Sequence, residues 1–209
     1  MSDPSAVRPP RTDAVRNRRL VLSAAAEAFA EQGTEVSIAE IAQRAGLGKG
    51  TVFRHFPTKD YLIAAIMEEI IDSLIARADV LSGAGDPAAA LLEFMTAGVE
   101  LLVQDRALCE VVGQPSLQQA SVQAGINRLC QAVEALTDRA RRRGAVRPDI
   151  SGQDIVLLLA GIRQTAAPLA ETRPELWRRY LALVFDGMQV RSAATLPQPL
   201  PQRLEFPVA

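Results

Sequence analysis

Histidine and cysteine are scarce in this chain of 209 residues. It has one histidine, His55, and two cysteines, Cys109 and Cys130, which are too few for a disulfide framework and lack CxxC spacing. We expect two buried free thiols, because free cysteine behaves as a small hydrophobe. One histidine and scattered carboxylates supply no nucleophile–base pair and no metal-ligand cluster. We therefore expect no catalytic residues, no metal site and no cofactor.

Aromatic residues and long apolar runs are also lacking. Aromatic residues make up 4% of the chain, although 48% is hydrophobic. Ala, Leu and Val carry that hydrophobicity, which favours helices over a β-sandwich. No run approaches the roughly 20 apolar residues of a membrane span, and the Arg- and Pro-rich N-terminus has no apolar signal region. These features predict an all-α, cytoplasmic protein that does not enter a membrane.

The few lysines lie in one place. Residues 1–60 carry nine Arg and Lys against seven Asp and Glu, whereas residues 61–209 carry fourteen against seventeen. Both lysines, Lys49 and Lys59, and the only histidine fall within residues 36–59. This split predicts a mildly basic N-terminal end on a neutral to acidic body.

Start and stop signals divide the chain into helices. Ser37 and Glu40 have the spacing of a capping box, Gly46 ends the helix that follows, and Thr58 is placed to cap a long one. We expect a loose arm over 1–13, an N-terminal domain over 14–60 with helices at about 14–32, 38–45 and 48–56, and a connecting helix at about 59–81. A helical domain over 61–192 should then hold helices at about 87–104, 117–143, 152–170 and 174–191, with a shorter irregular helix after the first of them. A loose tail over 193–209 should follow.

Residues 36–59, VSIAEIAQRAGLGKGTVFRHFPTK, have the pattern of a helix-turn-helix. In the second helix Val52 and Phe56 are four residues apart and face the core together, which leaves four polar side chains facing outward: Lys49, Thr51, Arg54 and His55. Gly48 and Gly50 remove side chains where the backbone would approach a sugar-phosphate chain. The pattern favours major-groove recognition. A solvated helical hairpin without a partner is the alternative.

The same stretch, with AAAEAFAEQG before it and DYLIAAIMEEI after it, resembles the TetR (tetracycline-repressor-type) family of transcriptional regulators over residues 16–75. The resemblance implies about nine helices in two parts, an N-terminal helix-turn-helix domain and a larger C-terminal domain for ligand binding and dimerisation. It also implies a homodimer on a palindromic double-stranded DNA operator, and repression released by a small-molecule effector.

The resemblance assigns DNA-binding roles position by position. Ser37 should cap its helix and touch a phosphate, Lys59 and His55 should bind phosphates, and the recognition helix should supply the remaining contacts: Gly48, Lys49, Gly50, Thr51 and Arg54. Phe53 stands where the family usually has Tyr, so the contact of that hydroxyl with a phosphate is absent. The ring of Phe53 can still pack against a sugar or a thymine methyl group.

The resemblance is weaker in the body. It implies dimerisation through the last two helices, with Leu157, Ala160, Gly161, Leu181, Val184, Phe185 and Met188 as interface candidates. Polar or aromatic residues within apolar segments are the effector candidates: Phe94, Glu110, Asn127, Arg128, Arg163 and Gln164. Arg163 and Gln164 line either a pocket or the rim of the dimer. An enzyme and an architectural DNA-binding protein without an effector are the other classes considered. Substrate turnover without duplex binding would favour the first, and the absence of any thermal shift with metabolites the second.

Overall fold

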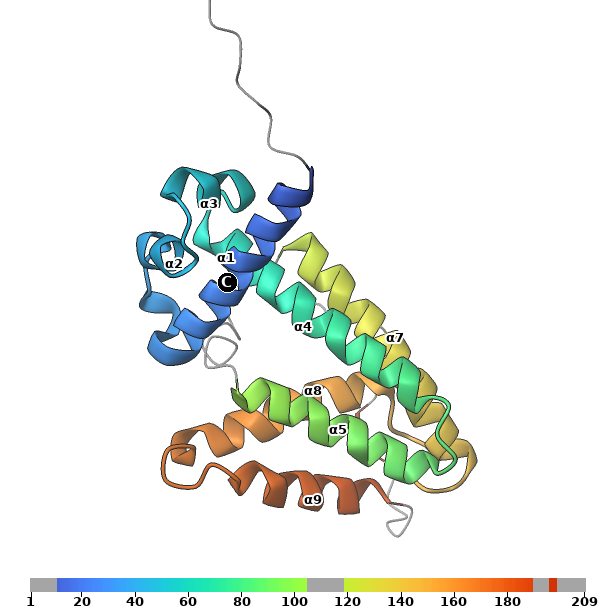
Figure 1. The fold of residues 1–209 in the computed structure, drawn as a ribbon. Coiled ribbons are helices and arrows are strands. Elements are labelled where there is room, and N and C mark those ends of the chain that lie inside the picture. The colour runs from blue at the N-terminus through green and yellow to red at the C-terminus, as the bar shows by residue number, and fades with distance from the viewer. Residues whose placement is uncertain (1–10, 105–118, 190–195, 199–209) are drawn as a thin grey trace, which may run out of the picture.

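The computed structural model describes residues 11–104, 119–189 and 196–198, and eight α-helices without a strand make up these parts of the chain (Figure 1). The all-α class is confirmed. The α-helices are α1 (Arg11–Gln32), α2 (Ile38–Arg44), α3 (Lys49–His55), α4 (Lys59–Leu81), α5 (Pro87–Gln104), α7 (Ala120–Arg142), α8 (Gly152–Ala166) and α9 (Leu176–Met188). Two short 3-10 helices, η1 (Gly33–Glu35) and η3 (Ala167–Leu169), follow α1 and α8.

Most helix bounds lie close to those predicted, and the differences have local causes. α1 begins at Arg11, inside the predicted loose arm, with Asp13 in its first turn where a negative charge suits the helix dipole. α8 ends at Ala166 because Pro168 cannot continue an α-helix, and the chain tightens into η3. α9 begins at Leu176, after Pro174. The irregular helix predicted after α5 falls at 105–118, outside the described residues.

The first three helices, here called the N-terminal unit, form a small group at the upper left of Figure 1. α1 packs against α2, α3 and the start of α4. The core of this unit contains two large aromatic side chains, Phe29 and Phe56, together with Val21, Ile41 and Val52, all of them buried. With so few large side chains, each one supports the position of α3.

The remaining helices form the body. α4 and α7 lie side by side and cross above α5, α8 and α9 (Figure 1). Gly152 lets α8 approach α7 closely, because a Cβ atom there would lie 2.5 Å from the backbone nitrogen of Glu134 and 2.6 Å from the carbonyl oxygen of Cys130. The body core is built from large apolar side chains of α5, α7 and α8, among them Leu91, Phe94, Met95, Leu136, Ile155 and Leu159.

Arg139 of α7 ties the far end of α4 to the body. Its guanidinium donates to the carbonyl oxygens of Leu81 at 3.3 Å, of Ala84 at 2.5 Å, and of Ser82. Three of the carbonyls at the α4–α5 turn thereby gain a charged donor. α4 is consequently held at its C-terminal end by α7, while its N-terminal end carries the N-terminal unit.

Three further expectations have an outcome here. Cys130 is a buried free thiol, and its burial raises the pKa to about 11, so the thiol stays protonated; Cys109 lies outside the described residues. In the part of the tail that the structure describes, the backbone N–H of Leu196 donates to Asp149 Oδ2 at 3.0 Å. No helix within the described ranges is long and apolar enough to cross a membrane.

Candidate nucleic-acid interface and ligand cavity

Local hydrogen bonds build the α2–α3 turn as the sequence predicts. The backbone N–H of Glu40 donates to Ser37 Oγ at 3.2 Å, and the N–H of Ser37 donates to Glu40 Oε2 at 2.9 Å, which completes the capping box. The Ser37 hydroxyl, which donates to Glu40 Oε2, and the Ser37 backbone N–H together hold the pKa of Glu40 below its ordinary value. Gly46 has φ +67°, and Leu47 N–H donates to Ala42 O at 2.9 Å across it. This is the Schellman ending of a helix, which sets the direction in which α3 starts.

The side chains of α3 divide into a buried side and an exposed side, as a recognition helix requires. Val52 is completely buried, whereas Phe53 is 49% exposed and Lys49 and Arg54 are exposed. Thr51 and His55 are partly buried. A Cβ atom added to Gly48 or Gly50 would meet nothing within 4 Å, so packing inside the chain does not require glycine at either position. The space beside these glycines is open to an outside partner.

Two contacts that the sequence did not reveal brace this surface. Arg44 at the end of α2 donates to Glu31 of α1 at 2.7 Å, and this hydrogen bond lowers the pKa of Glu31. The guanidinium of Arg18 lies 5.3 Å from the ring centroid of Phe56, just beyond α3. Both pairs join residues far apart in sequence, and no local pattern marks them.

Ser37 and Lys59 occupy the positions predicted for phosphate contacts, and both have partners within the chain. The hydroxyl of Ser37 donates to Glu40 Oε2 at 2.7 Å, so a phosphate would have to share or replace that bond. The Nζ of Lys59 lies 5.8 Å from the ring centroid of Phe29, which sets the direction of the lysine side chain at the start of α4. The phosphate contacts themselves stay predictions.

The effector candidates within the described residues do not line one cavity together. Arg163 is 2% exposed and lines a cavity of about 640 Å³ with Trp177, but neighbouring Gln164 is exposed and does not line it. Phe94 is fully buried in the core and lies outside that cavity, as do half-buried Asn127 and exposed Arg128. Glu110 lies outside the described residues. Of the candidates within the described residues only Arg163 lines this cavity, and the place of Gln164 at the rim of the dimer, the alternative given above, stays a prediction.

Arg128 has a different role. Its Nη2 donates to Asp72 Oδ1 of α4 at 2.9 Å, in an ion pair with both side chains more than half exposed. Exposed pairs of this kind contribute little to stability, on the order of 1 kcal/mol or less. The pair does mark the contact between α4 and α7.

The seven dimer candidates divide into two groups by burial. Leu157 and Gly161 on α8 are exposed, and Ala160 and Val184 are partly so. Leu181, Phe185 and Met188 are only 4%, 7% and 4% exposed. These three are largely covered within the single chain, and their place at a surface between two copies stays a prediction. The outer face of α9 is instead marked by Leu183, at 56% exposed.

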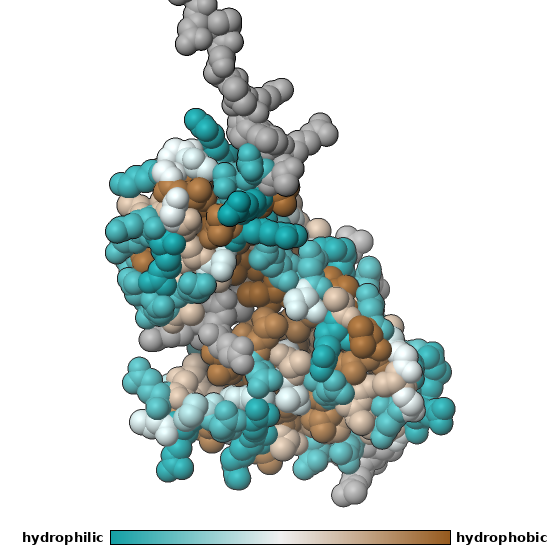
Figure 2. Space-filling view, viewed as in Figure 1, coloured by the Kyte–Doolittle hydropathy of each residue, from teal (hydrophilic) through white to brown (hydrophobic). Residues whose placement is uncertain are grey.

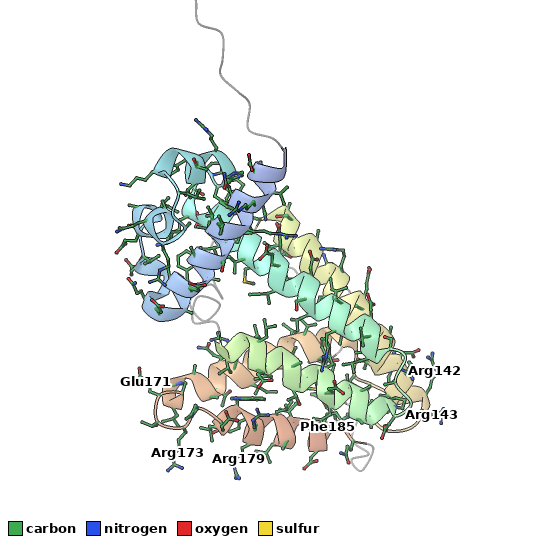
Figure 3. All side chains as sticks on the ribbon, viewed as in Figure 1. Arg142, Arg143, Glu171, Arg173, Arg179 and Phe185 are labelled. Atoms are coloured by element: carbon green, nitrogen blue, oxygen red, sulfur yellow. The ribbon has the colours of Figure 1, made fainter. Side chains whose placement is uncertain are left out.

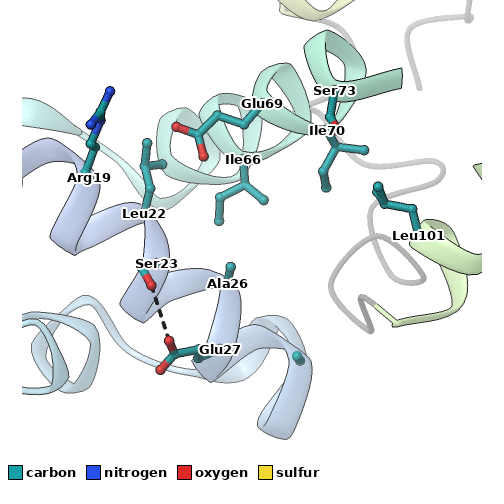
Figure 4. A pocket seen from close by; sticks show the side chains of 11 residues that line it. Arg19, Leu22, Ser23, Ala26, Glu27, Ile66, Glu69, Ile70, Ser73 and Leu101 are labelled. Atoms are coloured by element: carbon teal, nitrogen blue, oxygen red, sulfur yellow. Dashed lines mark hydrogen bonds between the residues drawn. The ribbon is translucent and has the colours of Figure 1, made fainter. Parts of the chain in front are cut away.

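A cleft of about 710 Å³ separates the N-terminal unit from the body (Figure 4). Apolar side chains from α1, α4 and α5 line it, and Figure 2 shows hydrophobic residues gathered in the hollow between the two parts of the molecule. The residues are Leu22, Ala26, Ala30, Ile66, Ile70 and Leu101, with Arg19, Ser23, Glu27, Glu69 and Ser73 beside them.

Comparison with known proteins gives the same division of the chain. A family model described as bacterial regulatory proteins of the tetR family matches residues 21–66, and one described as the SbtR-like transcriptional regulator C-terminal domain matches residues 86–190. A TetR transcription regulatory protein of Mycobacterium vanbaalenii, known from its crystal structure, is 33% identical, with a TM-score of 0.63. That alignment covers 87% of this chain and all of the other.

Curated relatives match over the N-terminal part. The regulator SAR0097 of Staphylococcus aureus (strain MRSA252) is 37% identical over 67 residues, which are 31% of this chain and 35% of that protein. The HTH-type transcriptional repressor Rv3405c of Mycobacterium tuberculosis (strain ATCC 25618 / H37Rv) is 45% identical over 51 residues, 24% of this chain and 27% of the repressor. The matches thus span about a third or less of these relatives.

Proposed function

Because this chain belongs to the TetR family of DNA-binding transcriptional regulators, we propose that it is a ligand-responsive repressor that binds a palindromic operator as a homodimer. The relative Rv3405c, named a transcriptional repressor, supports repression as the sign of regulation. Binding to DNA supports a cytoplasmic location. We expect the chain to regulate transcription by occupying its operator and not by converting a substrate.

The arrangement of α3 is the observation that carries the DNA-binding part of the proposal. Val52 and Phe56 anchor the helix, which leaves Lys49, Arg54 and the backbone beside Gly50 open to a groove. Arginine and lysine suit the acceptor atoms of guanine in the major groove. A phosphate contact from Lys59 would fix the register of the helix on the duplex.

Selection of bound duplexes from a random library tests the operator. We expect an inverted repeat, because a twofold dimer presents two copies of α3. Arg54→Ala should then weaken operator binding by roughly tenfold or more, the range for a lost base contact. Arg142→Ala is the matched control, since Arg142 is exposed at the far end of the body (Figure 3). Equal losses of operator affinity for the two variants would contradict a DNA contact from α3 through Arg54.

Exposed apolar residues of α8 and α9 support the homodimer. Leu157 and Leu183 are uncovered, and Gly161 has nothing within 4 Å of an added Cβ, so another helix can approach closely there. Leu183→Arg should shift sedimentation of the chain from dimer toward monomer. Val80→Arg is the control, because Val80 is 74% exposed on α4. A wild-type chain that sediments as a monomer at micromolar concentration would contradict the proposal.

The cleft between α1 and α4 supports ligand response, because a body that changes shape can move the N-terminal unit there. If an effector lowers operator affinity by some factor, the operator must lower effector affinity by the same factor. Calorimetry with and without operator, together with operator titrations with and without effector, gives both factors. Two factors that disagree would mean that the two ligands do not act through one equilibrium.

A further inference from the structure

The C-terminal tail returns to the body after α9 has ended. The backbone N–H of Arg147, in the loop between α7 and α8, donates to the carbonyl oxygen of Met188 at the end of α9, at 2.8 Å. Further along the chain, the backbone N–H of Leu196 donates to Asp149 of the same loop. The loop therefore holds the chain at two points, once at the end of α9 and once in the tail.

Asp149 is the centre of this contact. Its Oδ2 accepts hydrogen bonds from Arg147 Nη2 at 2.8 Å and from the Leu196 N–H at 3.0 Å. The Arg147 guanidinium, and after it the Leu196 N–H, hold the pKa of Asp149 well below its ordinary value, so the carboxylate stays charged at neutral pH. Charge-assisted hydrogen bonds are stronger than neutral ones, and these hold the tail in place. Arg147, Asp149 and Leu196 are here called the tail clasp.

The tail clasp places an apolar side chain at a surface groove between α8 and α9. Leu196 lines this groove, which has a volume of about 410 Å³. An added Cβ at Gly161 or Gly187 would meet nothing within 4 Å, so the groove is open beside both glycines. Leu196, at 40% exposed, extends the surface on which Leu157 is 38% exposed. The remaining lining residues are Arg147, Ile150, Asp154, Leu158, Val184 and Met188.

The charges at this groove suit contact between two identical surfaces. A twofold interface brings each residue close to the same surface of another copy, so an uncompensated charge at its centre would meet its own sign. The two charged lining residues have partners in their own chain: Arg147 pairs with Asp149, and Asp154 accepts from the Ser151 N–H at 2.7 Å. The rest of the lining is apolar, as in the core of homodimer interfaces.

We infer that the tail clasp makes Leu196 a third part of the dimer surface, beside α8 and α9, and that a second copy of this chain covers it. This inference rests on the proposed homodimer and adds to it a segment outside the two helices. A tail that is already hydrogen-bonded loses little further conformational entropy when it is covered, which favours association. Covering Leu196 also removes its exposed apolar surface from water.

Leu196→Asp tests the inference, because it places a charge on the covered surface and leaves the core of the single chain intact. The dissociation constant of the dimer of the full chain should rise about tenfold or more, measured by sedimentation velocity over a dilution series. Leu20→Asp is the matched control, since Leu20 is also 40% exposed but lies on α1. It should leave the dissociation constant unchanged. Circular dichroism checks that both variants fold.

Asp149→Ala tests whether the tail clasp positions Leu196. The variant removes the acceptor of the Leu196 N–H, and the dissociation constant of the dimer should rise about threefold, as for the loss of one ordinary hydrogen bond. Combined with Leu196→Asp it should add nothing, because the two substitutions disturb the same contact. Effects that add would mean that Asp149 acts on the dimer independently of Leu196, and would contradict the positioning role.

The outcomes separate this inference from the homodimer on which it rests. A wild-type chain that stays monomeric at micromolar concentration contradicts both. A dimer that Leu183→Arg weakens and Leu196→Asp does not contradicts the inference alone, because α9 then forms the interface without the tail. A tighter dimer for Leu196→Asp also overturns the inference, since the tail would then cover the groove in place of a second copy.

Discussion

The N-terminal unit and the body of this regulator use the same secondary structure for different ends. In the N-terminal unit, seven-residue helices α2 and α3 are held by a cap, a glycine turn and a few aromatic side chains, and the residues predicted to bind DNA lie mostly at the surface. In the body, helices of 13 to 23 residues pack around a larger core, and one charged side chain, Arg163, is buried among them. Both parts combine local capping contacts with contacts between segments far apart in the chain, and they differ chiefly in the size of the core.

The difference in core size predicts which substitutions lower the stability of each part. A small core loses much of its stability when a single large side chain is removed, because little else holds the recognition helix in place. A larger core tolerates single truncations better but is sensitive where two helix backbones touch. Four measurements test whether the two parts of the molecule differ in this way.

Phe29→Ala should have the largest effect, a loss of roughly 3–5 kcal/mol in the stability of the N-terminal unit, since Phe29 is completely buried there. Trp177, the only tryptophan, lies in the body, so its fluorescence reports unfolding of the body while circular dichroism reports all helices. In urea the variant should lose part of its helix signal before the fluorescence changes. Coincident transitions would mean that the two parts unfold as one unit. Phe53→Ala, at an exposed position, is the control.

Gly152→Ala should destabilise the body by about 1–3 kcal/mol, the usual cost of forcing extra atoms into a packed contact. The new methyl group would meet backbone atoms of Glu134 and Cys130, which cannot move without shifting α7. Gly98→Ala is the matched control: its methyl group would meet only the Leu159 side chain, at 2.7 Å, and a leucine can change rotamer. If the two variants have the same urea midpoint by Trp177 fluorescence, the α7–α8 contact is more adaptable than we argue.

Lys49→Ala and Lys59→Ala should differ in kind. Lys49, exposed at the start of α3, should lose about 1–3 kcal/mol on the preferred operator and less on random duplex, as for a base contact. Lys59 should lose affinity equally on both duplexes and lower the salt slope by roughly one unit, as for a phosphate contact. Titrations at several salt concentrations distinguish the two. If Lys49→Ala loses the same affinity on both duplexes, Lys49 contacts the DNA backbone and not a base.

The sequence predicted most of what is local. The capping box at Ser37 and Glu40, the turn at Gly46 and the burial of Val52 depend on residues within one or two helical turns, and all are present. The structure buries Arg163 in the lining of a cavity and leaves Gln164 exposed, although a hydrogen bond joins the two side chains. Which of them faces inward depends on α5 and α9, and no periodicity in α8 alone gives that answer.

The same limit explains the dimer candidates. Phe185 and Leu183 lie in one apolar stretch of α9, and the packing of α9 against α8 and α5 leaves the first buried and the second exposed. Likewise, the partner of Arg128 is 56 residues away, on α4. Contacts between segments far apart along the chain carry no signal in a single sequence.

Phe53→Tyr should have the smallest effect, and its sign carries the information. Phe53 is 49% exposed on α3, so an added hydroxyl reaches solvent without disturbing the core, and the free energy of unfolding should not change. On the operator, a hydroxyl that gains a phosphate partner should tighten binding by about 1 kcal/mol, the usual net contribution of a hydrogen bond. Tighter binding would place Phe53 at the DNA backbone. Weaker binding would place its ring against an apolar surface, such as a thymine methyl group, where a hydroxyl must give up water without a partner. Fluorescence anisotropy on one duplex, with urea unfolding as the control, decides between these two positions of the ring.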